Sequence, residues 1–200
     1  RIDNHEVVCA VMPVIGEIPN GDFQHCENLE MLQSSSSGIN YYIDGGKFPE
    51  GAKLCCMTGV YGNVIAEHLL GMVLSICRRI PEYRNQQNEN KWKILKFDKP
   101  LDESTVLILG AGDIGTTLAK WMRPMVGKII GIRRTERAFP DCFDEMFTLE
   151  KLDEKLTEAD MVRENGIVIC ECDDPTPVSC KGYRERSHAK YGRIYITVLV

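Results

Sequence analysis

The most constraining feature of this chain is a run of apolar residues that breaks directly into three glycines. Thr105 to Leu109 is short, aliphatic and β-branched, as expected of a strand buried in a parallel sheet. Gly110-Ala111-Gly112-Asp113-Ile114-Gly115 follows at once, and Thr116 to Arg123 then has the composition of a helix. Lys128 to Ile132 is predicted to be a second strand. The sequence therefore predicts a β-α-β unit with a G-x-G-x-x-G turn after its first strand.

Each glycine of this turn has a physical role in binding a dinucleotide. Gly110 permits a tight turn off the strand, Gly112 lets the backbone approach a pyrophosphate, and Gly115 lets the helix pack close to the strand. The helix N-terminus adds unpaired N–H groups and a partial positive charge. The predicted cofactor contacts are therefore Gly110, Ala111, Gly112, Asp113, Ile114 and Gly115. The alternative is a glycine-rich turn in an ordinary α/β domain.

The end of the second strand indicates which dinucleotide is bound. A unit specific for NAD places Asp or Glu about 20 residues after the glycines, where it accepts hydrogen bonds from a ribose hydroxyl. This chain instead has Arg133-Arg134-Thr135. Guanidinium groups bind a 2′-phosphate bidentately, whereas a carboxylate would repel it. The sequence thus favours NADP over NAD, the alternative being a solvated cluster of surface arginines.

Composition excludes several classes of protein. The chain has 200 residues, 44% hydrophobic and 26% charged, and no apolar stretch resembles a membrane span. A net charge of -5 without a basic stripe argues against nucleic acid as a partner. Nine cysteines, an odd number, predict free thiols in the cytoplasm. A zinc site at Cys170, Cys172, Cys180 and His188 is possible but disfavoured, because Cys-x-Cys in a strand lacks the turn of a metal knuckle. No metal is therefore expected.

Patterning divides the chain into three parts. Residues 1–58 are predicted to be part of a small α/β domain, with strands at Val7–Val11 and Lys53–Met57 and a serine–glycine loop between them. That loop is a plain turn or an anion-binding nest of backbone amides. Residues 59–90 are predicted to be a linking helix followed by a polar arm. Residues 91–200 form the dinucleotide domain, in which strands and helices alternate as a doubly wound parallel sheet requires.

The linking helix is expected at Asn63–Ile80, with apolar residues on more than one face and therefore broadly buried. Pro81 ends or kinks it, and Glu82–Lys93 follows as an exposed arm. His68 lies on this helix and is expected to pack or to lie in an interface rather than to catalyse. Further along the chain we expect a helix from Phe147 to Leu156 capped by Thr148, and strands at Gly166–Cys170 and Arg193–Val200.

Several separated motifs, taken in order, resemble the D-isomer-specific 2-hydroxyacid dehydrogenases. They are Gly59–His68, the long helix, Leu109–Gly115, Gly131–Thr135 and Leu156–Val162. Within that family the arginine pair resembles the NADP-linked glyoxylate and hydroxypyruvate reductases. The resemblance implies a Rossmann domain inserted, through the long helix, into a flavodoxin-like substrate domain. It also implies a homodimer packed through that helix, and contact of Ser36, Ser37 and Gly38 with the substrate carboxylate.

In such enzymes a hydride passes from NADPH to the carbonyl of a 2-keto acid, an arginine holds the carboxylate, and a glutamate-supported histidine supplies the proton. This chain departs from the pattern and resembles a copy that is incomplete at both ends. Asp174–Pro177 and Gly192–Ile196 stand roughly where a turn and strand of the family occur, yet no Gly-Arg-Gly follows. The catalytic arginine, glutamate and histidine are assigned to no residue here. The sequence leaves open whether this tail is divergent, disrupted in reading frame or truncated.

Three interpretations therefore remain: two functions of different class, and a polypeptide that does not fold stably. The first is an oxidoreductase that reduces a small 2-keto acid, with poor turnover expected of these 200 residues alone. The second is an inactive module that binds NADP or forms dimers. A sheet that lacks neighbouring strands would leave edges and apolar faces uncovered, so failure to fold is the third possibility.

Overall fold

The structure is a computed structural model, and it describes residues 9–12, 26–35, 39, 42, 48–95, 100–158, 167–172 and 194–199. The chain divides into two compact units, Arg1–Val60 with Val200 and Tyr61–Leu199. Both contain parallel sheets, which confirms the predicted α/β class. None of the helices in the described ranges combines the length and apolar character that a membrane span requires.

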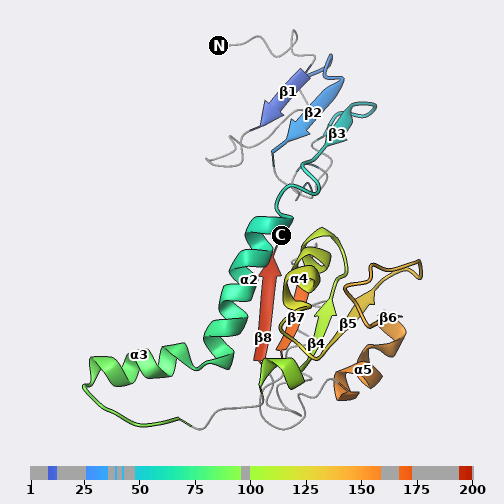
Figure 1. Ribbon diagram of the computed structural model, residues 1–200. Helices are drawn as coiled ribbons and strands as arrows, with labels where there is room; N and C mark the ends of the chain where they lie inside the picture. Colours follow the sequence, from blue (N-terminus) through green and yellow to red (C-terminus); the bar gives the residue numbers. More distant parts are fainter. Residues whose placement is uncertain are drawn as a thin grey trace. The chain divides into compact units, whose positions relative to one another are not determined.

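The first unit contains a three-stranded parallel sheet of β1 (Cys9–Met12), β2 (Met31–Ser34) and β3 (Lys53–Cys55), in the order β1-β2-β3 (Figure 1). Leu32 at the centre of β2 is fully buried, and Cys26, Leu29 and Tyr42 complete a small apolar cluster with it. The strands predicted near residues 7–11 and 53–57 are therefore present, although β3 is only three residues long.

The second unit is a five-stranded, fully parallel sheet in the order β6-β5-β4-β7-β8. Its strands are β4 (Thr105–Leu109), β5 (Lys128–Arg133), β6 (Glu145–Thr148), β7 (Ile167–Cys172) and β8 (Ile194–Leu199). The chain starts at β4, proceeds to one edge through β5 and β6, and then returns to the other side of β4 with β7 and β8. This order confirms the doubly wound sheet.

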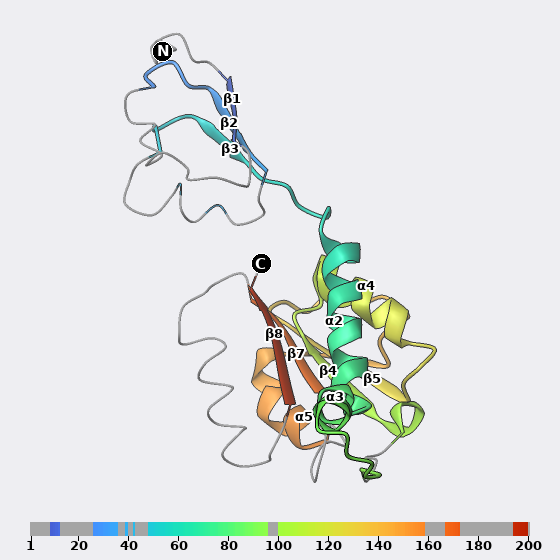
Figure 2. The same cartoon turned by 90° about the vertical axis from the view of Figure 1, so that its left-hand side faces the viewer.

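Within the described part of this unit, four helices and two short 3-10 turns accompany the sheet. They are α2 (Gly62–Cys77), α3 (Ile80–Asn88), α4 (Asp113–Met122) and α5 (Leu152–Glu158), with η3 (Leu101–Glu103) and η4 (Leu149–Lys151). α2 and α4 pack against each other, and the two views agree on this arrangement (Figures 1 and 2). β4 is buried along its whole length, as the apolar run predicted.

Two expectations about helices are corrected by the structure. α2 ends at Cys77 rather than Ile80, because Arg79 adopts a left-handed conformation with φ of 52° and is the N-cap of α3, which begins at Ile80 with Pro81 in its first turn. The arm that follows is helical through Asn88, and none of its residues is buried. The prediction that α2 is buried on more than one face is wrong for the single chain. Its buried residues, Gly62, Ala66, Leu69 and Val73, form a single stripe at helical spacing, and Val64 is 69% exposed.

The region after β5 is also corrected. Phe147 and Thr148 belong to edge strand β6, and the predicted helix begins only after them. Thr148 stands at the N-cap position of η4, but its side chain makes no capping hydrogen bond there. Leu152 and Leu156 are buried as their spacing predicted. Lys155 lies between them, with its Nζ 4.3 Å from the centre of the Phe147 ring and 3.7 Å from a Glu145 oxygen, so it joins α5 to β6.

Candidate dinucleotide site

The turn after β4 has the geometry of a glycine turn. Gly110 has φ of 104°, a conformation that residues with a Cβ rarely adopt, and its N–H donates a 2.9 Å hydrogen bond to the carbonyl of Ile132. This bond continues the pairing of β4 with β5 one residue beyond the strand. The chain therefore leaves the sheet sharply, directly above the carboxyl end of β4.

Gly115 holds the first turn of α4 against this turn. A Cβ at Gly115 would lie 1.9 Å from the carbonyl oxygen of Gly110 and 3.1 Å from the Ile108 side chain. No side chain larger than hydrogen fits in that space. The helix thus approaches the strand as closely as the third glycine of the motif was predicted to allow.

At the start of α4 the backbone is accessible to a ligand. Gly112 is the N-cap residue, exposed and in an extended conformation, and no side chain caps the helix there. Thr116 donates its backbone N–H to the carbonyl of Gly112, so the N–H groups of Asp113 and Ile114 precede this helical bond. A glycine at the N-cap, a helix N-terminus and a turn without side chains fit a pyrophosphate.

The position of this turn in the sheet is that of a ligand crevice. β4 lies between β5 and β7, with Leu109 paired to Ile132 on one side and Cys170 on the other. From β4 the chain proceeds to β5 and β6 on one side of that strand, and β7 then pairs with its other side. In open α/β sheets, ligands bind outside the carboxyl ends of the strands at such a switch point.

A second helix begins beside the same turn. Gly62 is the first residue of α2 and is buried, and a Cβ on it would lie 2.5 Å from Oδ2 of Asp113 and 2.9 Å from its Cγ. Asp113 is the first residue of α4. The two helix N-termini are therefore neighbours, with the Asp113 carboxylate between them. Sequence reasoning missed this contact, because nothing in the spacing of positions 62 and 113 signals it.

The arginines at the end of β5 do not share one environment. Both Nη atoms of Arg133 donate to the carbonyl of Ala138 at 3.3 Å, and its Nε is buried without a hydrogen-bond partner. Arg134, Thr135 and Arg137 are exposed. Arg133 thus closes the loop after β5 onto itself, while the next two predicted cofactor residues lie on its surface.

Asp144 fixes the beginning of β5. Its carboxylate accepts a 2.6 Å hydrogen bond from the Ile129 N–H and pairs with the guanidinium of Arg123, and its own N–H donates to the Ile129 carbonyl at 2.9 Å. Burial raises the pKa of Asp144, but the Ile129 hydrogen bond and the Arg123 charge outweigh it, so that the pKa is lowered overall. Nearby, burial raises the pKa of the Cys142 thiol.

Other predicted residues are not brought to this turn. Ser36, Ser37 and Gly38 lie outside the described residues, as do Asp174–Pro177, Gly192, Cys180 and His188. Their roles stay predictions. Ser34, just before the predicted loop, is buried at the end of β2. His68 is exposed on α2, away from the buried stripe of that helix.

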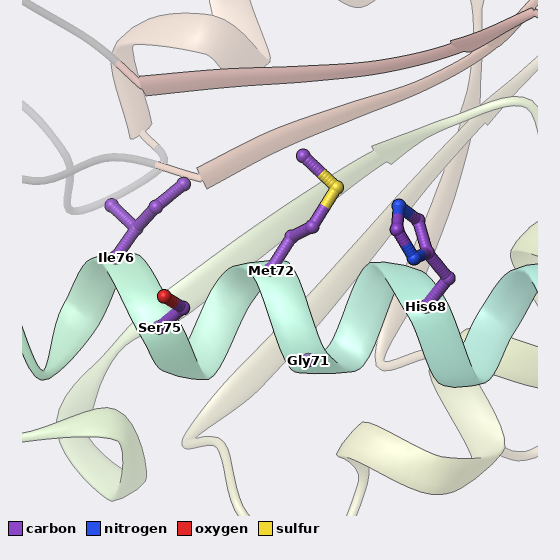
Figure 3. A pocket seen from close by; sticks show the side chains of 5 residues that line it. All are labelled: His68, Gly71, Met72, Ser75 and Ile76. Atoms are coloured by element: carbon purple, nitrogen blue, oxygen red, sulfur yellow. The ribbon is translucent and has the colours of Figure 1, made fainter. Parts of the chain in front are cut away.

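One side of α2 carries an apolar groove. His68, Gly71, Met72, Ser75 and Ile76 line it, and the side chains of His68, Met72 and Ile76 project from the same side of the helix (Figure 3). Met72 is 37% exposed and Val64, two turns away, 69%. Apolar side chains of this size are rarely left in water in a contiguous patch.

Comparison with known proteins agrees with this geometry. Residues 70–165 match the family model described as "D-isomer specific 2-hydroxyacid dehydrogenase, NAD binding domain". A curated relative, glyoxylate/hydroxypyruvate reductase A of Arabidopsis thaliana, is 34% identical over 96 residues, which are 46% of this chain and 30% of the relative. The chain spans 45% and 49% of the length of two further curated relatives.

Solved structures of D-isomer specific 2-hydroxyacid dehydrogenases have a similar fold. A D-isomer specific 2-hydroxyacid dehydrogenase family protein from Aeromonas salmonicida matches with 26% identity and a TM-score of 0.69, covering 88% of this chain and 54% of that one. A D-isomer specific 2-hydroxyacid dehydrogenase from Xanthobacter autotrophicus, solved with NADPH and MES, matches with 22% identity and a TM-score of 0.77. The match extends over 100% of this chain and 60% of the Xanthobacter protein.

The fold and the glycine turn define an NAD(P)-binding domain of the Rossmann type. Through this domain, residues 70–165 are similar to the NAD-binding domain of the D-isomer specific 2-hydroxyacid dehydrogenases.

Proposed function

We propose that this chain binds NADPH in preference to NADH and belongs to an oxidoreductase that reduces a small 2-keto acid. The observation that carries the proposal is the turn at Gly110–Gly115, where a helix N-terminus without a side-chain cap meets the carboxyl end of the central strand. The match of residues 70–165 to the NAD-binding domain of the D-isomer specific 2-hydroxyacid dehydrogenases supports the reaction class. The Arabidopsis relative and the NADPH-bound Xanthobacter structure support the choice of substrate class and cofactor.

The preference for NADPH rests on the loop after β5. Arg134 and Thr135 are exposed there, and the position where NAD-specific proteins carry a carboxylate holds arginine instead. A bidentate guanidinium contact with a 2′-phosphate contributes about 1.5–3 kcal/mol per charge-assisted bond. We assign the phosphate contact to Arg134 and Thr135. We assign to Arg133 the role of holding the loop in shape, because its guanidinium donates to the carbonyl of Ala138.

In the proposed reaction, different parts of the chain bind the cofactor and the substrate. A nicotinamide dinucleotide supplies the hydride when bound. The backbone N–H groups at the start of α4 orient its pyrophosphate, and the loop Ser36–Gly38 is proposed to hold the substrate carboxylate through its amides. We assign no proton donor among the 200 residues, and therefore expect them alone to turn over poorly. Reduction of glyoxylate or hydroxypyruvate at about 1 per second or faster would overturn this expectation.

We further propose a homodimer that forms through α2. The groove of His68, Met72 and Ile76, together with Val64, gives the helix an apolar face that this chain does not cover within its described residues. A second copy would bring an identical face, which a two-fold interface requires.

The proposal is tested by titrating the purified chain with NADPH and, separately, with NADH. The fluorescence of Trp92 and Trp121 reports binding, and Trp121 lies on α4 itself. Saturable binding with NADPH at least tenfold tighter supports both parts of the proposal. Equal affinities would overturn the assignment of the arginine loop. Absence of binding by either would overturn dinucleotide binding and with it the oxidoreductase assignment for this chain.

A further inference from the structure

We infer that Gly62 is a positioning residue for the dinucleotide turn, because its missing side chain lets the Asp113 carboxylate lie against the start of α2 and away from a bound pyrophosphate. The inference rests on the proposed dinucleotide binding. It concerns a residue of the linking helix that the glycine motif itself does not include.

The first step is the charge that the turn carries. Asp113 occupies the first position of α4, and its backbone N–H is one of the donors directed at the phosphates. A carboxylate at that position is favourable to the free helix, since it complements the positive helix end. Near a bound pyrophosphate the same carboxylate is repulsive. The turn therefore binds phosphate well only when the carboxylate is turned aside.

The second step is where the carboxylate lies. Its Oδ1, Oδ2 and Cγ are all within 2.9 Å of the position a Gly62 Cβ would take, so the whole group occupies the space of the missing side chain. The first turn of α2 contains no acidic residue, and its N-cap Tyr61 makes no side-chain capping hydrogen bond. The Asp113 carboxylate thus provides a negative charge for the N-terminus of a second helix.

The third step is the effect of a methyl group at position 62. An alanine there would overlap Asp113 Oδ2 at 2.5 Å. The overlapping atoms are the end of a short, exposed side chain, so that rotation of Asp113 relieves the clash and the fold survives. Rotation brings the charge back toward the phosphate site. Gly62→Ala should therefore weaken dinucleotide binding through charge.

The test is a double-mutant cycle of Gly62→Ala and Asp113→Ser, measured by fluorescence titration with NADPH and NADH. Gly62→Ala is expected to weaken both affinities about two- to fivefold, the effect of one charge at an exposed helix end. In the Asp113→Ser background the same substitution is expected to have no effect, since no carboxylate remains to be displaced. The loss should also diminish at about 0.5 M salt, where screening is stronger.

The control is Gly71→Ala on the same helix, where a Cβ meets nothing within 4 Å. It should leave both affinities unchanged. The inference is overturned by an equal loss on Gly62→Ala in the two backgrounds, by no loss at all, or by an equal loss on Gly71→Ala. If the unaltered chain binds neither dinucleotide, the proposed function and this inference fail together, whereas intact binding without coupling removes the inference alone.

Discussion

Gly115 and Gly110 touch so closely that no side chain fits between the first turn of α4 and the end of β4. The nearest atom to a Gly115 Cβ is the Gly110 carbonyl oxygen at 1.9 Å, and it belongs to the backbone. Gly110 in turn has φ of 104° and is bonded to Ile132. Neither residue can move without displacing the turn from the sheet.

Gly115→Ala is therefore expected to destabilise the protein and to abolish dinucleotide binding. Overpacking in a well-packed site costs about 1–3 kcal/mol, and here the helix itself must shift. Urea denaturation followed by circular dichroism measures the first effect, and the NADPH titration the second. Gly71→Ala serves as the matched control on an exposed helix position. A Gly115→Ala protein with unchanged stability and affinity would contradict the packing described here.

Substitutions of Arg133 and Arg134 are expected to weaken NADPH binding to different degrees. Arg134→Met is expected to weaken NADPH binding about tenfold to a hundredfold and to leave NADH binding unchanged, because only NADPH carries the 2′-phosphate. Arg133→Met removes two 3.3 Å hydrogen bonds to Ala138, and so loosens the loop that presents Arg134. Its expected effect on NADPH is smaller, about two- to tenfold. Titration of both variants with both dinucleotides measures the ranking, and a larger effect at Arg133 would reverse the assignment.

The sequence predicted most of the second unit, for physical reasons that particular residues show. A fully buried strand must be apolar throughout, and only glycine permits the backbone of Gly110 and the packing of Gly115, so this β-α-β unit follows directly from its composition. The edge strand β6 was missed because its four residues are half-buried and lack a clear period. α3 was missed because its residues are polar on every side.

Contacts between distant residues were less predictable. The Gly62 and Asp113 contact depends on how two helices pack, which no local pattern encodes. The hydrogen bonds of Arg133 to Ala138 were not predictable either, because they depend on the path of the loop that follows β5. Pro81 made it predictable that the helix breaks near this position. The left-handed conformation of Arg79, which forms the turn, was not predictable.

Asp144 predicts how stability depends on pH. Its pKa is lowered in the folded state, so the ionised carboxylate stabilises the fold above the ordinary aspartate pKa of 3.8. That contribution is lost as the pH falls below this value and through the lower pKa of the folded state. The Asp144 and Arg123 side chains are 38% and 34% exposed, so solvent reduces the interaction to about 1 kcal/mol.

Asp144→Asn should therefore lower the free energy of unfolding by about 1 kcal/mol at pH 7 and flatten its dependence on pH in the acidic range. Urea denaturation at a series of pH values measures both quantities. Glu154 is a useful comparison, because it pairs with Lys151 at an exposed helix position, and Glu154→Gln should change stability less. An unchanged pH dependence in Asp144→Asn would show that the Ile129 and Arg123 contacts do not stabilise the ionised form.

The apolar face of α2 predicts an oligomeric state that a single substitution disrupts. Met72→Glu places a charge in the groove beside His68 and Ile76, and desolvating that charge in a dimer interface would cost more than the apolar contact contributed. The variant should elute as a monomer in size-exclusion chromatography with light scattering, whereas the unaltered chain is expected to elute as the proposed dimer. Leu149→Glu, at a position 42% exposed on η4, is the matched control and should remain dimeric. If both variants and the unaltered chain are monomers at the same concentration, α2 is not the surface through which this chain associates.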